Sequence, residues 1–168
     1  ALLETPKIYN KVITRLEANE VADMLDIVES GSGLSKRQQK YHESTEKRDL
    51  AIITVFLGSG IRISELVGLN ISDVNFMTNE FVITRKGGNQ DVLPFGDEVR
   101  TALLNYMTER ENIITLEGSE DALFLSMQRK RISVRAVENL VKKYAIVASP
   151  LKKISPHKLR STYGTMLY

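Results

Sequence analysis

The sequence predicts a mainly helical α+β fold with one small three-stranded antiparallel sheet. Apolar residues recur at helical spacing through most of the chain. The middle instead holds three short runs of β-favouring residues separated by tight-turn sequences. A length of 168 residues suits a single domain with a sizeable core, and a composition of 42% hydrophobic and 26% charged residues is typical of a globular protein.

The first third is expected to form two helices joined by a polar loop. Residues 17–30 place apolar side chains at spacings of three and four and precede a Gly-Ser-Gly breaker. Residues 33–44 read as the loop, which contains His42. A strongly apolar helix over 46–60 follows. Its expected ends are Ser44 or Thr45 as the N-cap and Gly58 or Gly60 as the terminating glycine.

The middle of the chain changes period. A short helix over 62–69 follows the glycine turn. Three β-favouring runs come next, separated by "MTNE" and "GGN", and predict a small antiparallel sheet with tight turns. These runs are 72–76, 80–86 and 90–95.

Helical spacing then returns. Residues 97–113 are expected to form a helix whose buried stripe includes Val99, Leu103, Leu104 and Met107. A short buried segment is expected over 121–126. Another helix, 133–148, is capped by Ser133, and its expected inward-facing residues are Val134, Val137, Leu140 and Val141.

The last element begins at "SPHKLR". Ser155 at the N-cap and Pro156 at the first helical position are typical of a helix start. His157 and Arg160 then lie three residues apart on one face of the first turn. The unpaired N–H groups and the positive dipole end of that turn would repel two such side chains unless an anion binds there. A surface histidine beside an unrelated arginine is the competing interpretation.

Charge is distributed unevenly along the chain. Residues 1–127 contain 13 Lys or Arg and 20 Asp or Glu, a net charge of −7, whereas residues 128–168 contain 10 and one, a net charge of +9. A basic final quarter on an acidic body indicates a surface for a polyanion, although a solvated lysine-rich helix face would have the same composition. The lack of cysteine excludes a disulfide framework and fits a reducing cytoplasm.

Three sequence boxes, taken in order, resemble the catalytic domain of the tyrosine recombinases, the phage-integrase family, and above all the integrases of bacterial mobile elements. "GIRISELVGLNISDV" is similar to the first arginine box, with Arg62 as the catalytic arginine and Glu65 as its acidic companion. "VITRKGGNQDVLPF" is similar to the hairpin that carries the catalytic lysine, here Lys86. "SPHKLRSTYGT" is similar to the H-x-x-R box, which contains His157 and Arg160.

The resemblance implies a function in site-specific DNA recombination and integration. A tyrosine hydroxyl would attack a phosphodiester, leaving a 3′-phosphotyrosyl link and a free 5′-hydroxyl, with no metal and no other cofactor. Arg62 and Arg160 would stabilise the charge on the phosphoryl oxygens. Lys86 would protonate the leaving oxygen, and His157 would assist proton transfer. Taken alone, Lys86 would read as an ordinary hairpin-tip lysine.

The resemblance also implies partners and boundaries. The partner is double-stranded DNA, with tetramers expected on DNA and a cytoplasmic, DNA-associated location in a bacterium. Residues 1–15 are expected to be an interdomain linker and 16–168 a catalytic domain truncated at its C-terminus. Candidate DNA-contacting residues are Arg85, Lys130, Arg135 and Lys153.

The chain departs from the family pattern in its nucleophile and at Asp91. Tyr163 fills the position of a core aromatic and Tyr168 falls too early, so no nucleophile is expected within this chain and residues 1–168 are expected not to cleave DNA. Asp91 stands where relatives often have a basic residue, which would weaken phosphate contacts on the hairpin. His42 matches no box. The competing hypothesis is a catalytically inactive DNA-binding module, supported by the basic final quarter alone.

Overall fold

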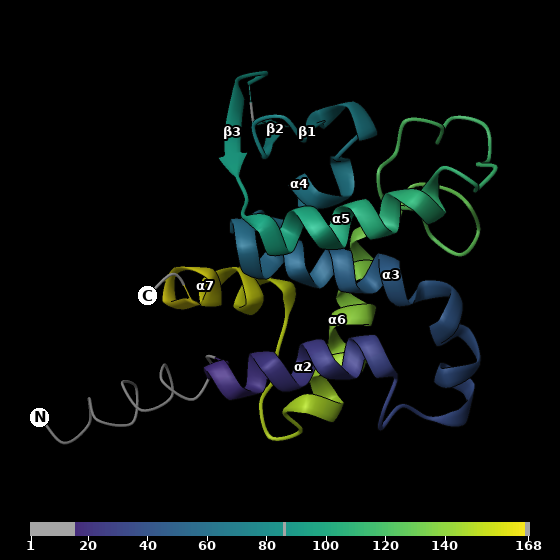
Figure 1. Cartoon of the computed structure of the whole chain (residues 1–168), viewed down its shortest axis with the longest axis vertical. Coiled ribbons are helices and arrows are strands. Elements are labelled where there is room, and N and C mark those ends of the chain that lie inside the picture. Colours follow the sequence, from purple (N-terminus) through teal and green to yellow (C-terminus); the bar gives the residue numbers. More distant parts are fainter. Residues whose placement is uncertain (1–15, 86, 167–168) are drawn as a thin grey trace, which may run out of the picture.

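The computed structural model describes residues 16–85 and 87–166, with side chains described through residue 162. The chain is mostly helical with one three-stranded sheet, as the sequence predicts. Figure 1 shows the sheet and α4 at one end of the molecule, α3 and α5 side by side across the middle, and α2 at the other end. The elements are α2 (Ala18–Ser30), α3 (Lys36–Ser59), α4 (Ile63–Gly68), a 3-10 turn (Ile71–Asp73), β1 (Val74–Asn75), β2 (Glu80–Thr84), β3 (Gln90–Pro94), α5 (Asp97–Arg110), α6 (Val134–Ala148) and α7 (Pro156–Met166). The expected linker, residues 1–15, lies outside the described residues.

Helix α3 is longer than predicted because it begins ten residues early. Ser35 caps it: its hydroxyl accepts a hydrogen bond from the Gln38 N–H at 3.2 Å, and Gln38 Oε1 accepts one from the Ser35 N–H at 2.9 Å. This Ser-x-x-Gln pair is a capping box that the prediction of a polar loop overlooked. The expected caps were wrong, since the hydroxyls of Ser44 and Thr45 bond back to the Tyr41 carbonyl inside the helix. The expected end at Gly60 is confirmed: Gly60 is the C-cap, with φ of 68°.

His42 is a buried helical residue, not the loop residue that was expected. Its Nε2 lies 2.6 Å from the Val28 carbonyl oxygen, which links α3 to the last turn of α2. The same imidazole constrains Gly31, the C-cap of α2, which has a φ of 73°. A β-carbon on Gly31 would lie 2.8 Å from His42 Nδ1, so this turn has no room for a side chain. The histidine is therefore structural.

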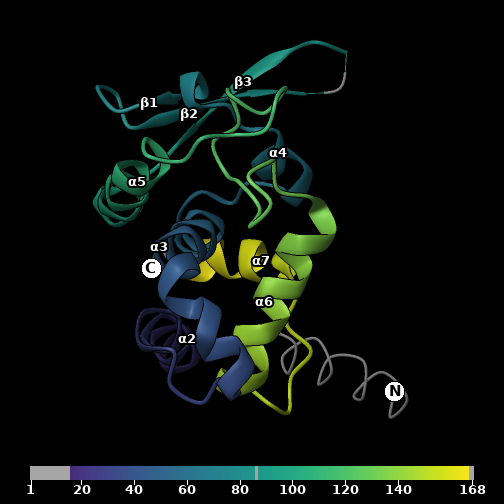
Figure 2. The same ribbon diagram turned by 90° about the vertical axis from the view of Figure 1, so that its right-hand side faces the viewer.

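The sheet has the predicted three strands in the order β1-β2-β3, all antiparallel. Its inward face presents Phe81 and Ile83 from β2, both buried. The Phe81 ring packs on Phe95 with 4.7 Å between ring centroids. Figure 2 shows the sheet lying over α4 and α5 at one end of the molecule. The strands are shorter than the runs in the sequence, but their number and direction are confirmed.

Helix α3 forms the centre of the core. Five of its apolar residues are fully buried because α2, α5 and α7 pack around it (Figure 2). Burying each of the Ile, Val and Phe side chains among them contributes about 1.5–3 kcal/mol relative to exposure. These residues are Ala51, Ile52, Ile53, Val55 and Phe56.

Two of the predicted buried stripes need one correction each. In α5, Leu104 is 42% exposed, and Tyr106 is buried one helical turn from Leu103 instead. The Tyr106 hydroxyl donates to the Leu123 carbonyl at 2.7 Å, which satisfies its polar end, and burial raises the pKa of Tyr106 to about 12. In α6, Val134 is 38% exposed because it lies at the first position after the cap. The buried segment expected over 121–126 is confirmed for Ala122 through Leu125.

A buried ionic cluster joins α3 to α6. The Asp49 side chain is completely buried, and its Oδ1 accepts hydrogen bonds from Arg48 Nε at 3.0 Å and Arg48 Nη2 at 2.8 Å. Its Oδ2 accepts a hydrogen bond from the Tyr144 hydroxyl at 2.5 Å and lies 3.5 Å from Lys143 Nζ. Removing one member of such a cluster leaves the others desolvated and unpaired, which costs more than the cluster contributes.

We predict that Asp49→Ala lowers the free energy of unfolding by about 3–5 kcal/mol. The loss arises because Arg48 and the Tyr144 hydroxyl stay buried without their partner. Urea unfolding followed by circular dichroism measures it. Asp26→Ala, at an exposed carboxylate of α2, serves as the control and should change stability by less than about 0.5 kcal/mol. Equal effects of the two substitutions would show that the cluster is not a stabilising unit.

Candidate active site

The candidate site begins at the turn between α3 and α4. Gly60 adopts a left-handed conformation, which ends α3 and redirects the chain. The next side chain, Ile61, is completely buried and anchors the turn in the core. Arg62 then occupies the N-cap position of α4 and is exposed. A buried anchor followed at once by an exposed arginine holds the backbone of Arg62 rigidly while its guanidinium faces solvent.

Arg160 meets this turn from the other end of the chain. Its Nε donates a hydrogen bond to the Gly60 carbonyl oxygen at 2.6 Å, and its side chain is half-buried. The contact joins residues 100 positions apart and crosses from α7 to the end of α3. Since Gly60 lies two residues before Arg62, the contact places Arg160 at the turn that presents Arg62. The structure thus brings together the two arginines that the sequence analysis paired.

The start of α7 presents His157 beside Arg160. The helix begins at Pro156, and the Lys158 N–H approaches the Ser155 hydroxyl at 3.4 Å, a weak version of the expected cap. Pro156 is buried, whereas His157 is exposed in the first turn. Leu159, completely buried, fixes the rotation of the helix about its axis. With Leu159 turned inward, His157 and Arg160 lie near the start of α7, and Arg160 reaches the α3–α4 junction.

The β2–β3 hairpin approaches the same turn through Glu65. One carboxylate oxygen of Glu65, Oε1, accepts a hydrogen bond from the Arg62 backbone N–H at 3.0 Å. The other, Oε2, lies 3.5 Å from Arg85 Nε at the end of β2. Arg85 Nε also lies 3.4 Å from Asp91 Oδ2. The predicted catalytic lysine, Lys86, lies outside the described residues, but its preceding neighbour is placed at the site.

The loop that leads into α7 is tied to α2 by contacts that the sequence analysis did not foresee. Glu20 Oε2 accepts a hydrogen bond from the Ser149 hydroxyl, and Glu20 Oε1 accepts one from Lys152 Nζ, both at 2.5 Å. Burial alone would raise the pKa of Glu20, but the hydrogen bonds from Lys152, Ser149 and the Glu17 backbone together lower it. The signal was absent from the sequence because the partners are about 130 residues apart.

Not every basic residue of the final quarter is available to bind a polyanion. Lys130, Arg135 and Lys153 are exposed, as expected of residues that contact a polyanion. Arg131 is turned inward: its Nη1 donates to the carbonyls of Val67 and Leu69, both at 3.0 Å, at the C-terminal end of α4. An arginine at this position caps the helix that carries Arg62, so its role is structural.

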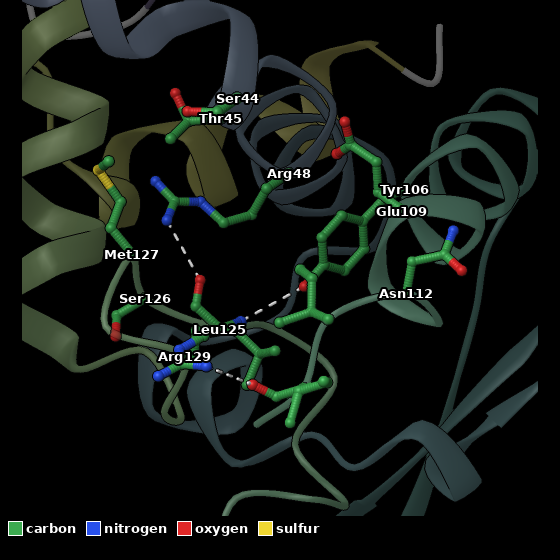
Figure 3. A pocket seen from close by; sticks show the side chains of 12 residues that line it. Ser44, Thr45, Arg48, Tyr106, Glu109, Asn112, Leu125, Ser126, Met127 and Arg129 are labelled. Carbon is green, nitrogen blue, oxygen red and sulfur yellow. Dashed lines mark hydrogen bonds between the residues drawn. The ribbon is translucent and has the colours of Figure 1, made fainter. Parts of the chain in front are cut away.

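One pocket of the described structure lies apart from the predicted site residues. Figure 3 shows a pocket of about 420 Å³ between α3, α5 and the segment that follows α5, and none of the predicted site residues lines it. Its wall is held by hydrogen bonds from Arg48 to the Leu125 carbonyl and from the Leu125 N–H to the Tyr106 hydroxyl. Among the described side chains, no three His, Cys, Asp or Glu residues are grouped to hold a metal ion. In the same part of the chain, no helix is long and apolar enough to cross a membrane.

Comparison with known proteins decides the family. The model of the phage integrase family matches residues 14–168. The chain belongs to the phage integrase family. Within this family, the chain is 38% identical over 156 residues to tyrosine recombinase XerS of Streptococcus agalactiae serotype III (strain NEM316). That match covers 89% of this chain and 43% of the relative. The resemblance inferred from the three boxes is therefore confirmed.

Solved structures of the phage integrase family share the fold. The crystal structure of XerA recombinase superimposes with a TM-score of 0.74 at 25% identity, over 92% of this chain and 50% of that one. The Tn1549 transposon integrase, in complex with circular intermediate DNA, superimposes with a TM-score of 0.62 at 20% identity, over 91% of this chain and 52% of that one. The chain spans about half the length of these relatives or less. The predicted fold class is confirmed.

We predict that Glu20→Gln loosens the loop before α7. The substitution removes the charge that holds Lys152, so backbone amides of residues 149–155 should exchange hydrogen faster at pH 7, and the free energy of unfolding should fall by about 1–2 kcal/mol. Because the folded-state pKa of Glu20 lies below its ordinary value, this stabilisation is present above the ordinary value and is lost as the pH falls through the folded value. The difference in the free energy of unfolding between Glu20→Gln and the unsubstituted protein should therefore shrink towards pH 3.

Glu29→Gln, at an exposed position of the same helix, is the matched control for charge. It should leave exchange in residues 149–155 unchanged. If the difference in the free energy of unfolding between Glu20→Gln and the unsubstituted protein did not change with pH, this would contradict an ionic contact between Glu20 and Lys152.

Proposed function

We propose that this chain is the catalytic-domain portion of a site-specific DNA recombinase and that the scissile phosphate of duplex DNA binds at the α3–α4 turn. The observation that carries the proposal is the hydrogen bond from Arg160 Nε to the Gly60 carbonyl, which gathers two arginines at one turn. Because Nε is engaged with the protein, the two Nη groups of Arg160 are the donors that remain to meet a phosphate. Guanidinium groups suit this task, since they stay charged and match phosphate oxygens geometrically.

The reaction would proceed by attack of a tyrosine hydroxyl on phosphorus. A bond forms between the tyrosine oxygen and phosphorus, the bond from phosphorus to the 5′-oxygen breaks, and the products are a 3′-phosphotyrosyl link and a 5′-hydroxyl. Negative charge gathers on the non-bridging oxygens in the transition state, where Arg62 and Arg160 would stabilise it. No tyrosine within residues 1–168 is proposed as the nucleophile, so these residues alone are expected to bind DNA without forming the covalent link.

Proton transfer would fall to two groups beside the arginines. The tyrosine hydroxyl loses a proton and the leaving 5′-oxygen gains one, so the net reaction conserves protons. We assign protonation of the leaving oxygen to Lys86 from its place in the hairpin box. His157, exposed in the first turn of α7, can hold or release a proton near neutral pH.

The surface around the turn supports binding of a long polyanion. Helix α6 packs against α4, so the exposed Arg135 in its first turn is on an element next to the one that Arg62 begins. Lys130 and Lys153 are exposed on either side of α6 in sequence. The related Tn1549 integrase was solved in complex with DNA. We infer a cytoplasmic protein whose partner is duplex DNA and whose full-length form assembles as a tetramer on it.

A DNA-binding module without catalysis is the competing function. The exposed basic residues would serve it equally well, but it assigns no role to the Arg160–Gly60 contact. Cleavage by the full-length protein separates the two functions.

We predict that Arg160→Ala in the full-length protein lowers the rate of covalent complex formation on a nicked suicide substrate by about 10²–10³-fold, the effect of losing one preorganised donor to a transition-state oxyanion. DNA affinity should fall only modestly, because many other phosphate contacts remain. Gel analysis of the covalent adduct and a binding titration measure the two effects. Retained cleavage by this variant would refute the assignment of Arg160.

A second prediction concerns binding. Lys130→Ala combined with Arg135→Ala should weaken binding to duplexes of any sequence, and should reduce the slope of log affinity against log salt by about one for each residue. Lys40→Ala, at an exposed position in the first half of α3, is the control and should leave the slope unchanged. An unchanged slope in the double variant would place the DNA surface elsewhere.

A further inference from the structure

We propose that Arg85 is a positioning residue for the reaction: it fixes the end of β2 to the α3–α4 turn, so that Lys86, the next residue, is delivered to the scissile phosphate. The inference rests on the proposed function, in which Lys86 protonates the leaving oxygen. It assigns to Arg85 a role distinct from contact with DNA and to Asp91 a role other than weakening phosphate binding. Figure 2 shows the β2–β3 hairpin above α4, the helix that supplies the other half of the contact.

The hairpin geometry places Arg85 and Asp91 on one face. In the register of β2 and β3, Ile83 pairs with Asp91, and the Arg85 N–H donates to the Asn89 carbonyl at 2.7 Å. Arg85 and Asp91 are thus diagonal neighbours across the two strands, a distance that a long side chain spans easily. This explains the 3.4 Å between Arg85 Nε and Asp91 Oδ2.

Glu65 connects this pair to the catalytic turn. Its carboxylate is shared, with Oε1 on the Arg62 backbone N–H at 3.0 Å and Oε2 at 3.5 Å from Arg85 Nε. The Glu65 side chain is only 9% exposed, so solvent screens the interaction less than at an open surface. A displacement of the hairpin would therefore also shift the backbone of Arg62, and a displacement of that backbone would shift the hairpin.

The Nε atom of Arg85 is in an unusual state. It is buried, yet among the described residues it has no hydrogen-bond partner of good geometry, although two carboxylate oxygens lie within 3.5 Å. A buried donor without such a partner requires an explanation. Sharing between two carboxylates provides one: the guanidinium is held by charge from both sides and centred between the hairpin and α4.

The energy of this contact is too small for a role in folding. The Arg85 side chain is 33% exposed and that of Asp91 is 58% exposed, and ion pairs of this kind contribute at most about 1 kcal/mol to stability. The energy of the same contact is enough to restrict the conformations of a loop. Gly87 and Gly88 follow with φ of 90° and 82°, and both are exposed. Glycines give the turn many accessible conformations, so its position depends on how its first residue is anchored.

The test uses the full-length protein, Arg85→Gln, and two nicked duplexes that differ in one atom. In the first, the leaving atom is the natural 5′-oxygen; in the second, it is a 5′-bridging sulfur. A thiolate leaves without being protonated, so cleavage of the sulfur substrate does not need a correctly placed general acid. If Arg85 positions Lys86, Arg85→Gln should slow single-turnover cleavage of the oxygen substrate by about 10–100-fold, within the range for general acid catalysis. On the sulfur substrate, its rate should be within about threefold of the unsubstituted protein, since the arginines that stabilise the phosphoryl charge are untouched.

Three controls fix the interpretation. Arg37→Gln removes an exposed arginine from the first turn of α3, which lies far from the hairpin (Figure 1), and should cleave both substrates at the unsubstituted rate. Asp91→Asn, which removes the other carboxylate, should show the same selective loss in a weaker form. Glu65→Gln combined with Arg85→Gln should slow cleavage of the oxygen substrate by less than the product of the single effects, because both act through one contact.

The outcomes are distinguishable. An equal loss on both substrates would show that Arg85 binds DNA or supports the fold, and would overturn the positioning role. Unchanged cleavage of the oxygen substrate by Arg85→Gln would also overturn it. If the unsubstituted full-length protein forms no covalent adduct on either substrate, the proposed function itself fails.

Discussion

The hydrogen bond from Arg160 Nε to the Gly60 carbonyl is the contact on which the site depends. A helix end leaves its last carbonyl oxygens without intrahelical partners. Here one of them, at the end of the most buried helix, is satisfied by a guanidinium from the last helix described. This hydrogen bond engages Nε of Arg160 with the backbone and thereby sets where its Nη donors lie. Without it, the two arginines would belong to separate elements with no reason to converge.

Support for this contact extends outward in steps. Glu20 ties the loop before α7 to α2, Leu159 sets the rotation of α7, and the buried Asp49 cluster joins α3 to α6. Arg131 caps the end of α4 from the segment before α6. Each of these contacts holds a backbone element rather than a ligand. The residues that face solvent can therefore be long, flexible cations, because the backbone beneath them is fixed.

Local pattern was sufficient for some parts of the fold and insufficient for others. The three strands, the C-cap at Gly60 and the start of α6 at Ser133 follow from turn chemistry and capping, which act over a few residues. The start of α3 was misjudged because polar residues 36–44 resemble a loop, although the Ser35–Gln38 box indicates a helix. His42 was misjudged with it, since its burial requires α2 to pack beside α3.

The sequence by itself determined the family, and the family match agrees. It also predicts the members of the site, Arg62, Lys86, His157 and Arg160, from residue types and their order in three short boxes. Tertiary structure decided which charges are available. Arg131 and Arg160 Nε are directed to backbone carbonyls, and Arg85 lies between two carboxylates, whereas Lys130 and Arg135 remain exposed. The physical reason is that a side chain's hydrogen-bond partners are set by elements that meet only after folding, and the sequence separations of up to 132 residues seen here carry no local signal.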